Sequence, residues 1–239
     1  TPRTGPGSQR TAFGSGRQVR PMVAAQDHKR AFDGDEGPNT GGMGAYTESF
    51  AIGRSGLSFI SDADYDFAVT KILQPVANAM ADAGTPLSGV LYGGLMKTPT
   101  GVKVIEFNAR FGDPETEVVL PRLESDIYAV FEAVAEGGVI PALDWKDVSV
   151  MGVVMASKGY PGSYAKGAPI EVAPAFAERI YHMGTKRTDE GLVTAGGRVL
   201  MVVAEAPMMA AAAKRCYAGV SLINCENLFY RKDIAKYVL

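Results

Sequence analysis

The sequence predicts an α+β fold in which antiparallel sheets carry helices on their faces. Residues 62–83 place apolar side chains at helical spacing. Residues 89–98 and 101–108 are two strand-like runs separated by a Thr-Pro-Thr-Gly turn. Beyond residue 148, several strand-like runs accompany one helical stretch rich in Ala and Met, so we expect the C-terminal part to be mostly β.

The N-terminal elements are less regular. The first ten residues, TPRTGPGSQR, contain Gly, Pro, Ser and Arg without an apolar anchor, which is typical of a flexible tail. A short strand is expected around residues 19–23. Residues 27–46 contain five glycines and almost no hydrophobic periodicity. Such a long irregular segment inside a compact domain is usually functional.

The helix predicted for residues 62–83 has Asp62 or Asp64 as its cap, and Pro75 should kink or divide it. A second helix is expected from about Asp126 to Ala135. The Gly- and Pro-bearing stretch that follows, EGGVIPALDW, indicates a subdomain boundary.

The C-terminal strands are expected at 148–157, 179–185, 192–197 and 198–206, and the Ala/Met helix at 206–219. We therefore divide the chain into an atypical or flexible segment (1–18), a first domain (19–145) and a C-terminal α+β domain (146–239).

Composition narrows the classes of function. Of the 239 residues, 46% are hydrophobic and the net charge is −2, so no clustered positive face for nucleic-acid binding is expected. No apolar stretch approaches the roughly 20 residues of a membrane helix. The two cysteines, Cys216 and Cys225, form no CxxC pair and are expected to be reduced. We expect a cytoplasmic protein.

Residues 105–117, IEFNARFGDPETE, follow an apolar run with an unusual density of charge. Strand alternation would place Glu106, Asn108 and Arg110 on one face, together with Val104, while Ile105 and Phe107 point into a core. A carboxylate and an amide oxygen suit Mg²⁺, and a planar guanidinium suits a phosphoryl oxygen. The alternative is a surface strand that faces water. The Gly/Pro turn and the carboxylates that continue the run favour a site, namely Gly112, Pro114, Asp113, Glu115 and Glu117.

A second candidate is the glycine-rich run GPNTGGMGAY. Its glycines, at positions 41, 42 and 44, would leave backbone amides free to approach an anion. The alternative is an ordinary surface turn. Nearby Lys29 and Arg30 could meet carboxylate or phosphate, whereas His28 has no second His or Cys beside it and is not read as a metal ligand. A third Gly-bearing loop, 157–167, is interpreted from its composition as a solvated connection.

With these motifs in place, the chain resembles the glycinamide ribonucleotide synthetases, a family of ATP-grasp ligases. The stretches that carry the resemblance run in order from about residue 19 to 235, and the most specific is RFGDPETE. The others are RPMVAAQDHKRAFDGDEGPNTGGMGAY, GVLYGGLM, VVMASKGYPGSY, GGRVLMVV and YRKDIA. The resemblance implies an ATP-grasp subdomain, an antiparallel sheet with helices, followed by a small mostly-β C-terminal domain.

The resemblance also implies a reaction in purine biosynthesis. Glycine, ATP and 5-phosphoribosylamine would give glycinamide ribonucleotide, ADP and phosphate through a glycyl phosphate, with Mg²⁺ or Mn²⁺ as the metal. Glu106 and Asn108 match the metal ligands, Arg110 the catalytic arginine, and Met96 is taken as an apolar contact of the adenine. The substrate-binding residues are taken to be Asp27, Lys29, Arg30, Asn39, Thr40, Gly41, Gly42, Met43, Gly44, Asp113 and Glu115.

The chain also departs from this family. Family members are much longer, so the N-terminal half of the ligase is expected in cis, and these 239 residues alone are expected to bind Mg-ATP weakly and to turn over nothing measurable. Where the family has a Gly-Glu-Glu-x-Ser segment, this chain has GPGSQRTAF. Two alternatives stay open, a non-catalytic remnant that acts as a binding module and an ATP-grasp ligase for another carboxylate.

Overall fold

The computed structural model describes residues 7–239, apart from the side chain of Ile52. The chain forms two compact units. The first unit contains residues 1–26 and 47–147, and the second contains residues 27–46 and 148–239. The chain passes between the units three times, after Gln26, after Tyr46 and after Asp147. Residues 27–46 belong with the C-terminal part, although the sequence-based division included them in the 19–145 domain.

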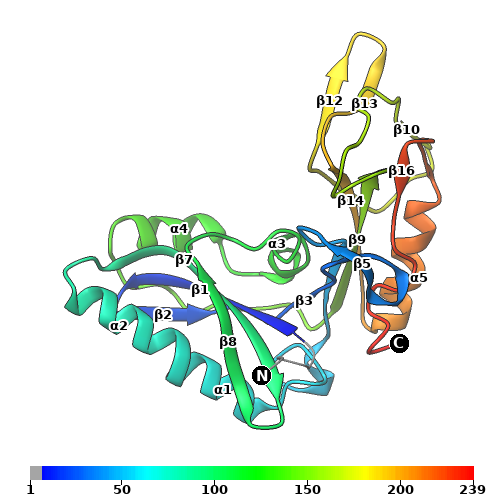
Figure 1. Ribbon diagram of the computed structural model, residues 1–239. Helices are drawn as coiled ribbons and strands as arrows, with labels where there is room; N and C mark the ends of the chain where they lie inside the picture. The colour runs from blue at the N-terminus through cyan, green and yellow to red at the C-terminus, as the bar shows by residue number, and fades with distance from the viewer. Residues whose placement is uncertain (1–6) are drawn as a thin grey trace. The chain divides into compact units, whose positions relative to one another are not determined.

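The first unit is built on a four-stranded antiparallel sheet, in which the strands follow the order β2-β1-β7-β8 (Figure 1). Its long central pair aligns β1 with β7 along ten residue pairs, from Gly7 opposite Met96 to Gly16 opposite Leu87. The bounds of its strands are β1 (Gly7–Gly16), β2 (Gln18–Pro21), β7 (Leu87–Thr98) and β8 (Gly101–Asn108).

The flexible segment predicted for residues 1–18 is wrong from residue 7 onward. Residues 7–16 form β1, and every residue from Ser8 to Ser15 is buried; the whole strand pairs with β7, and residues 12–15 pair also with β2. Small polar side chains can occupy a central strand because the ladder satisfies their backbone groups on both edges. The composition of residues 7–16 does not indicate a strand. The first six residues of the predicted tail lie outside the described part.

Helices cover both faces of this sheet. On one face, α2 (Gln74–Asp82) and the turn before it pack Leu73 and Ala77 against Ala12 and Leu91. On the other face, Phe131 of α4 (Ile127–Ala135) meets Phe13 edge to face, with ring centroids 6.0 Å apart. Alternation along β1 sends Ala12 to one helix layer and Phe13 to the other.

The helical stretch predicted for 62–83 is present as three consecutive pieces, α1 (Asp62–Phe67), the π-helical η3 (Ala68–Leu73) and α2. Pro75 stands in the first turn of α2, directly after the π-helical η3. The cap is Ser61 rather than Asp62 or Asp64. Ser61 and Asp64 form a reciprocal capping box, so Asp64 supports the helix start from its third position. The helix expected from Asp126 is α4, with Asp126 as its cap.

The second unit has a six-stranded sheet with the order β11-β14-β9-β6-β3, and β16 also pairs with β9. The two long strands, β9 (Ser149–Ser157) and β14 (Arg198–Ala206), are its buried centre, and α5 (Met209–Val220) packs on both of them. The other strands of the sheet are β3 (Gln26–Asp27), β6 (Gly44–Thr47), β11 (Arg179–His182) and β16 (Leu228–Phe229).

Short elements complete the chain. Three two-stranded pairings join β4 (Arg30–Phe32) with β5 (Glu36–Asn39), β10 (Glu171–Val172) with β15 (Ile223–Asn224), and β12 (Thr185–Thr188) with β13 (Gly191–Thr194). The remaining helical turns are η1 (Asp33–Asp35), η2 (Phe50–Ile52), α3 (Thr116–Val119) and η4 (Leu120–Arg122). Within the described residues, no helix has the length and apolar character needed to span a membrane.

Candidate functional site

The strand β8 carries a bulge immediately before the predicted site residues. Leu95 of β7 pairs with Val104, but the next residue back, Gly94, pairs with Glu106, so Ile105 is the extra residue. A bulge reverses the alternation of faces beyond it. The predicted shared face of Val104 and Glu106 is therefore wrong. Val104 packs toward Ile72 on the face that α2 covers, whereas Glu106 lies on the opposite face.

The side chains of Ile105 and Phe107 do not enter a core as the sequence predicted. Ile105 is 50% exposed and Phe107 is 41% exposed. Within the described part of the chain, β8 is an edge strand that pairs with β7 alone. Strand periodicity reports which face a side chain takes and not whether something packs against that face.

Glu106 and Asn108 do share a face, as predicted. They pair with Gly94 and Tyr92 of β7, and the Asn108 amide donates a 3.1 Å hydrogen bond to Oε1 of Glu106. This bond uses the nitrogen of the amide, and so it orients a carboxylate and an amide oxygen side by side. Such a donor set fits Mg²⁺, which takes few protein oxygens and completes its shell with water and phosphate. Among the described residues, no group of three or more His, Cys, Asp or Glu side chains could hold a metal.

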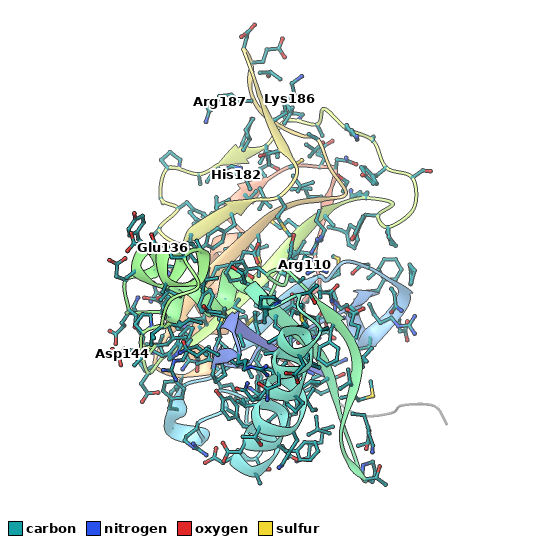
Figure 2. The ribbon with its side chains drawn as sticks, turned by 90° about the vertical axis from the view of Figure 1, so that its left-hand side faces the viewer. Arg110, Glu136, Asp144, His182, Lys186 and Arg187 are labelled. Carbon is teal, nitrogen blue, oxygen red and sulfur yellow. The ribbon has the colours of Figure 1, made fainter. Side chains whose placement is uncertain are left out.

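Arg110 lies two residues beyond the end of β8 and is exposed (Figure 2). Its guanidinium carbon is 5.8 Å from the centre of the Tyr92 ring, and Nη1 donates to the carbonyl of Phe111 at 2.8 Å. Tyr92 is on the same face of the sheet as Asn108, its partner in the ladder. Arg110 is therefore held near the strand that carries the carboxylate and amide.

The turn after Arg110 is fixed by a buried contact. The Tyr92 hydroxyl donates a 2.8 Å hydrogen bond to Glu115, whose side chain is almost fully buried. Gly112 passes close beside this pair, because a Cβ there would lie 2.7 Å from Glu115 Oε2 and 2.8 Å from Tyr92 Cε2. Glu115 thus acts as a structural group of this turn, while Asp113 at its tip is exposed.

Met96 lies on β7 two residues beyond Gly94, the ladder partner of Glu106. Residues two apart on a strand share a face. The half-buried Met96 side chain is therefore on the same face of the sheet as Glu106.

The glycine-rich run belongs to the second unit, and its amides are not open as the sequence suggested. The N–H of Thr40 donates to Lys29 O at 2.7 Å, that of Gly42 to Thr40 Oγ1 at 3.0 Å, and that of Met43 to His28 O at 2.8 Å. The N–H of Gly41 donates to the Tyr160 hydroxyl at 2.9 Å. The loop folds back on residues 28 and 29, and the N–H groups of residues 40–43 all have hydrogen-bond partners within the second unit.

The end of this run is part of the core of the second unit. Met43 is fully buried, and its carbonyl accepts from Val154 N at 3.0 Å, so its side chain is a core residue rather than an exposed contact. A Cβ on Gly44 would lie 2.6 Å from the carbonyl oxygen of Gly152 on β9. The glycine at 44 serves close packing of two strands and not the approach of a ligand.

The predicted polar residues at the start of the segment lie at its surface, apart from Asp27, whose side chain is almost buried and forms an ion pair with Lys29. Arg30 is exposed and donates to Gly37 O at 2.7 Å, and it pairs with the exposed Asn39 in the β4–β5 hairpin. Lys29 is also largely exposed.

Two residues beside the glycines were missed by sequence reasoning. Tyr160 comes from the loop after β9 that composition indicated to be a solvated connection, and Arg198 begins β14. Arg198 Nη1 donates to Gly41 O at 3.1 Å. The only sequence signal was their place in the motifs SKGYPG and GGRVL. Tyr160 also borders a hollow of about 510 Å³ lined by Phe32, Pro38, Lys158, Gly159, Pro161, Gly162 and Phe229.

A cluster of charges ties the 27–46 segment to the end of the chain. Arg231 has a fully buried side chain and binds both Asp233 and Asp35, the latter at 3.0 Å. Lys236 and the Tyr237 hydroxyl also bind Asp35. Partial burial opposes ionisation of Asp35, but hydrogen bonds from Lys236, Tyr237 and Arg231 outweigh it and lower its pKa. This cluster explains why the segment belongs to the second unit.

His28 is buried at the edge of this cluster. Its Nε2 accepts a 3.0 Å hydrogen bond from Ala235 N, and its ring stacks on Tyr237. Burial, reinforced by the charge of Arg231, lowers the pKa of His28 to about 4. The imidazole is therefore neutral near pH 7 and serves as a structural acceptor.

The fold defines the class of protein. The chain superposes with a TM-score of 0.65 on a biotin carboxylase domain of Hydrogenobacter thermophilus 2-oxoglutarate carboxylase, solved with MgADP and bicarbonate, at 12% identity over 94% of this chain and 47% of that one. A family model for the ATP-grasp (A) domain of phosphoribosylglycinamide synthetase matches residues 4–116, and the C-domain model matches residues 150–237. The ATP-grasp match thus covers most of the first unit together with residues 27–46 of the second.

The chain belongs to the phosphoribosylglycinamide synthetase family, since the two matched stretches together cover most of it. It is 51% identical over 225 residues to the phosphoribosylamine–glycine ligase of Halalkalibacterium halodurans, which covers 93% of this chain. The crystal structure of the Thermotoga maritima phosphoribosylamine–glycine ligase superposes with a TM-score of 0.85 at 28% identity, over 97% of this chain and 56% of that one. The chain spans about half the length of the curated relatives it matches.

Proposed function

We propose that this chain carries the ATP-grasp and C-domain parts of an enzyme that ligates glycine to 5-phosphoribosylamine at the expense of ATP, giving glycinamide ribonucleotide, ADP and phosphate. The observation that carries the proposal is the arrangement on β8. Glu106 and Asn108 lie side by side behind a bulge, and Arg110 follows at the end of the same strand.

Each of these side chains would have a separate role. Glu106 and Asn108 would hold Mg²⁺ or Mn²⁺ by their oxygens, and the bound ion supplies neutralisation of phosphate charge. Arg110 would bind the oxygens of the glycyl phosphate with its planar guanidinium. Phosphoryl transfer to a carboxylate depends on alignment and charge stabilisation rather than on a covalent catalyst. Met96 would contact the adenine.

We propose that the surface of the second unit around residues 29–42 binds glycine and the sugar phosphate. Lys29, Arg30 and Asn39 are the exposed side chains of that surface, and Asp113 is the exposed carboxylate proposed for the turn after Arg110. Thr40 and Gly42 give the loop its shape through internal hydrogen bonds, and Gly41 is bonded to Tyr160 and Arg198. Asp27 holds Lys29.

We propose a cytoplasmic enzyme of purine biosynthesis that acts without nucleic acid or membrane. We further propose that activity requires the half of the relatives that this sequence does not span, because an ATP-grasp site that holds a nucleotide needs surfaces beyond those described. A chain that binds glycine and nucleotide but never turns over would be a binding module instead.

The experiment is an ADP-release assay with glycine, 5-phosphoribosylamine and Mg-ATP. It compares the 239-residue chain alone with the chain co-expressed with the N-terminal half of the Halalkalibacterium halodurans ligase. We expect no release from the chain alone, and release from the pair that requires both acceptor substrates. A folded, stable pair that releases no ADP contradicts the proposal, and release with a different carboxylate in place of glycine indicates another ATP-grasp ligase.

A further inference from the structure

The backbone of Gly41 is held by side chains of the second unit at both its N–H and its carbonyl group, which belong to two consecutive peptide groups. Its N–H donates to the Tyr160 hydroxyl at 2.9 Å, and its carbonyl accepts from Arg198 Nη1 at 3.1 Å. These two side chains come from segments about 40 residues apart in the sequence, the loop after β9 and the start of β14. A surface turn does not need two such contacts on one residue.

These contacts require glycine at two positions, Gly41 and Gly197. A Cβ on Gly41 would lie 2.9 Å from Cζ of Arg198, so any side chain there would push the guanidinium away. A Cβ on Gly197 would lie 2.4 Å from Cδ2 of Tyr160 and would displace the ring. Gly41 and Gly197 thus allow Arg198 and Tyr160 to reach the same residue.

We infer that Tyr160 and Arg198 are positioning residues, which fix the Gly41 backbone and thereby set the shape of the 39–44 loop before a substrate binds. The inference rests on the proposed function, because it assumes that the surface formed by this loop binds substrate. Neither side chain needs to touch the substrate. Their effect follows from preorganisation, since a loop that is already ordered loses less conformational entropy on binding.

The remaining donors of the loop support this reading. The N–H groups of Thr40, Gly42 and Met43 all donate to atoms within residues 28–40. These bonds close the loop on itself, but they do not attach Gly41 to the other segments of the second unit. Only the contacts to Tyr160 and Arg198, among the hydrogen bonds of the described residues, join Gly41 to other segments. Removing either contact should loosen Gly41 and leave Met43 anchored.

Four variants and two controls test the inference. Tyr160→Phe removes the hydroxyl and keeps the ring, Arg198→Lys removes the planar fork and keeps the charge, and Gly41→Ala displaces the guanidinium without altering Arg198. The double variant Y160F/R198K tests whether the two act on one residue. The controls are Tyr164→Phe, in the same loop as Tyr160, and Arg187→Lys, on the exposed β12–β13 hairpin (Figure 2).

The first readout is amide hydrogen exchange of the 239-residue chain, followed by nuclear magnetic resonance. We expect Y160F to speed exchange of the Gly41 N–H by roughly threefold to tenfold, the value of one neutral hydrogen bond, while the Met43 N–H and both controls stay unchanged. Unchanged exchange at Gly41 would overturn the contact itself, whatever the activity of the enzyme.

The second readout is the steady-state kinetics of the co-expressed pair. We expect Y160F, R198K and G41A each to raise the KM for glycine or for phosphoribosylamine by roughly threefold to tenfold, with the KM for ATP unchanged. The double variant should raise the KM by less than the product of the two single effects, because both side chains order the same residue, Gly41. Faster exchange at Gly41 with unaltered KM values refutes the positioning role, whereas an inactive wild-type pair refutes the proposed function and, with it, that role.

Discussion

Arg231 and Asp233 are joined by two parallel hydrogen bonds, 2.7 Å from Nε to Oδ1 and 2.8 Å from Nη2 to Oδ2. The same guanidinium reaches back 3.0 Å to Asp35 and donates 3.1 Å to the carbonyl of Arg30. A single buried side chain near the C-terminus therefore anchors a segment about 200 residues earlier.

Replacing Arg231 by Met should destabilise the second unit by about 2–4 kcal/mol, because it leaves Asp35 and Asp233 without their buried counter-charge. Urea denaturation followed by circular dichroism measures the change. The matched control is Arg179→Met, which breaks a largely exposed ion pair with Glu205 and should cost about 1 kcal/mol or less. Equal effects of the two variants would show that the buried cluster has no special weight.

The stability of the second unit should fall as the pH drops from about 6.5 to 4. Burial lowers the pKa of His28 from 6.5 to about 4, so in this window the unfolded chain binds a proton that the folded chain does not. The folded state is favoured fully above pH 6.5, and the loss on acidification should reach roughly 2–3 kcal/mol. Asp35 and Asp233, whose pKa values are lowered in the folded state, add to the loss below about pH 4.

Denaturation curves at several pH values test this dependence. His28→Gln keeps an acceptor for the Ala235 N–H but cannot titrate, so the slope between pH 6.5 and 4 should flatten. His182→Gln, at an exposed position on β11, is the control and should leave the slope as it is. A slope that H28Q does not change would assign the pH dependence to other groups.

Tyr92→Phe should destabilise the first unit by about 1–3 kcal/mol, because the buried Glu115 loses its hydrogen bond from the phenol. The change is read from thermal or urea unfolding. Tyr128→Phe removes a comparable hydroxyl bond to Glu132 on the exposed face of α4, and we expect it to be nearly neutral. A neutral Y92F would mean that the turn after Arg110 does not depend on this contact.

Much of the fold follows from local patterns in the sequence. The helical stretch 62–83, the strand pair around residue 100 and the helix α4 were all predicted, because periodicity and capping are properties of neighbouring residues. The strand β1 was not, since Gly7–Gly16 consists mostly of small and polar residues, and its burial comes from the strands β2 and β7 and from the helices α2 and α4. Its pairing with β2 and β7, and not its composition, makes this segment a strand.

The candidate site was predicted in part. Glu106 and Asn108 stand on one face as expected, but the bulge at Ile105 depends on the register with β7 and cannot be read from alternation. The glycine-rich run was expected to leave its amides open, yet they are bonded to residues 28 and 29, to the side chain of Thr40 and to Tyr160. Which donors a loop leaves open depends on the segments packed against it, and a glycine count does not contain that information.

ADP release by the co-expressed pair carrying Glu106→Gln tests whether β8 holds the metal. We expect kcat/KM to fall by about a hundredfold or more, since one oxygen ligand of the metal loses its charge. The unfolding midpoint should stay unchanged, because Glu106 is exposed on an edge strand. Glu136→Gln, at the exposed end of α4, is the control (Figure 2). Unchanged kinetics of E106Q in an active pair would contradict the metal role of β8 and the account built on it.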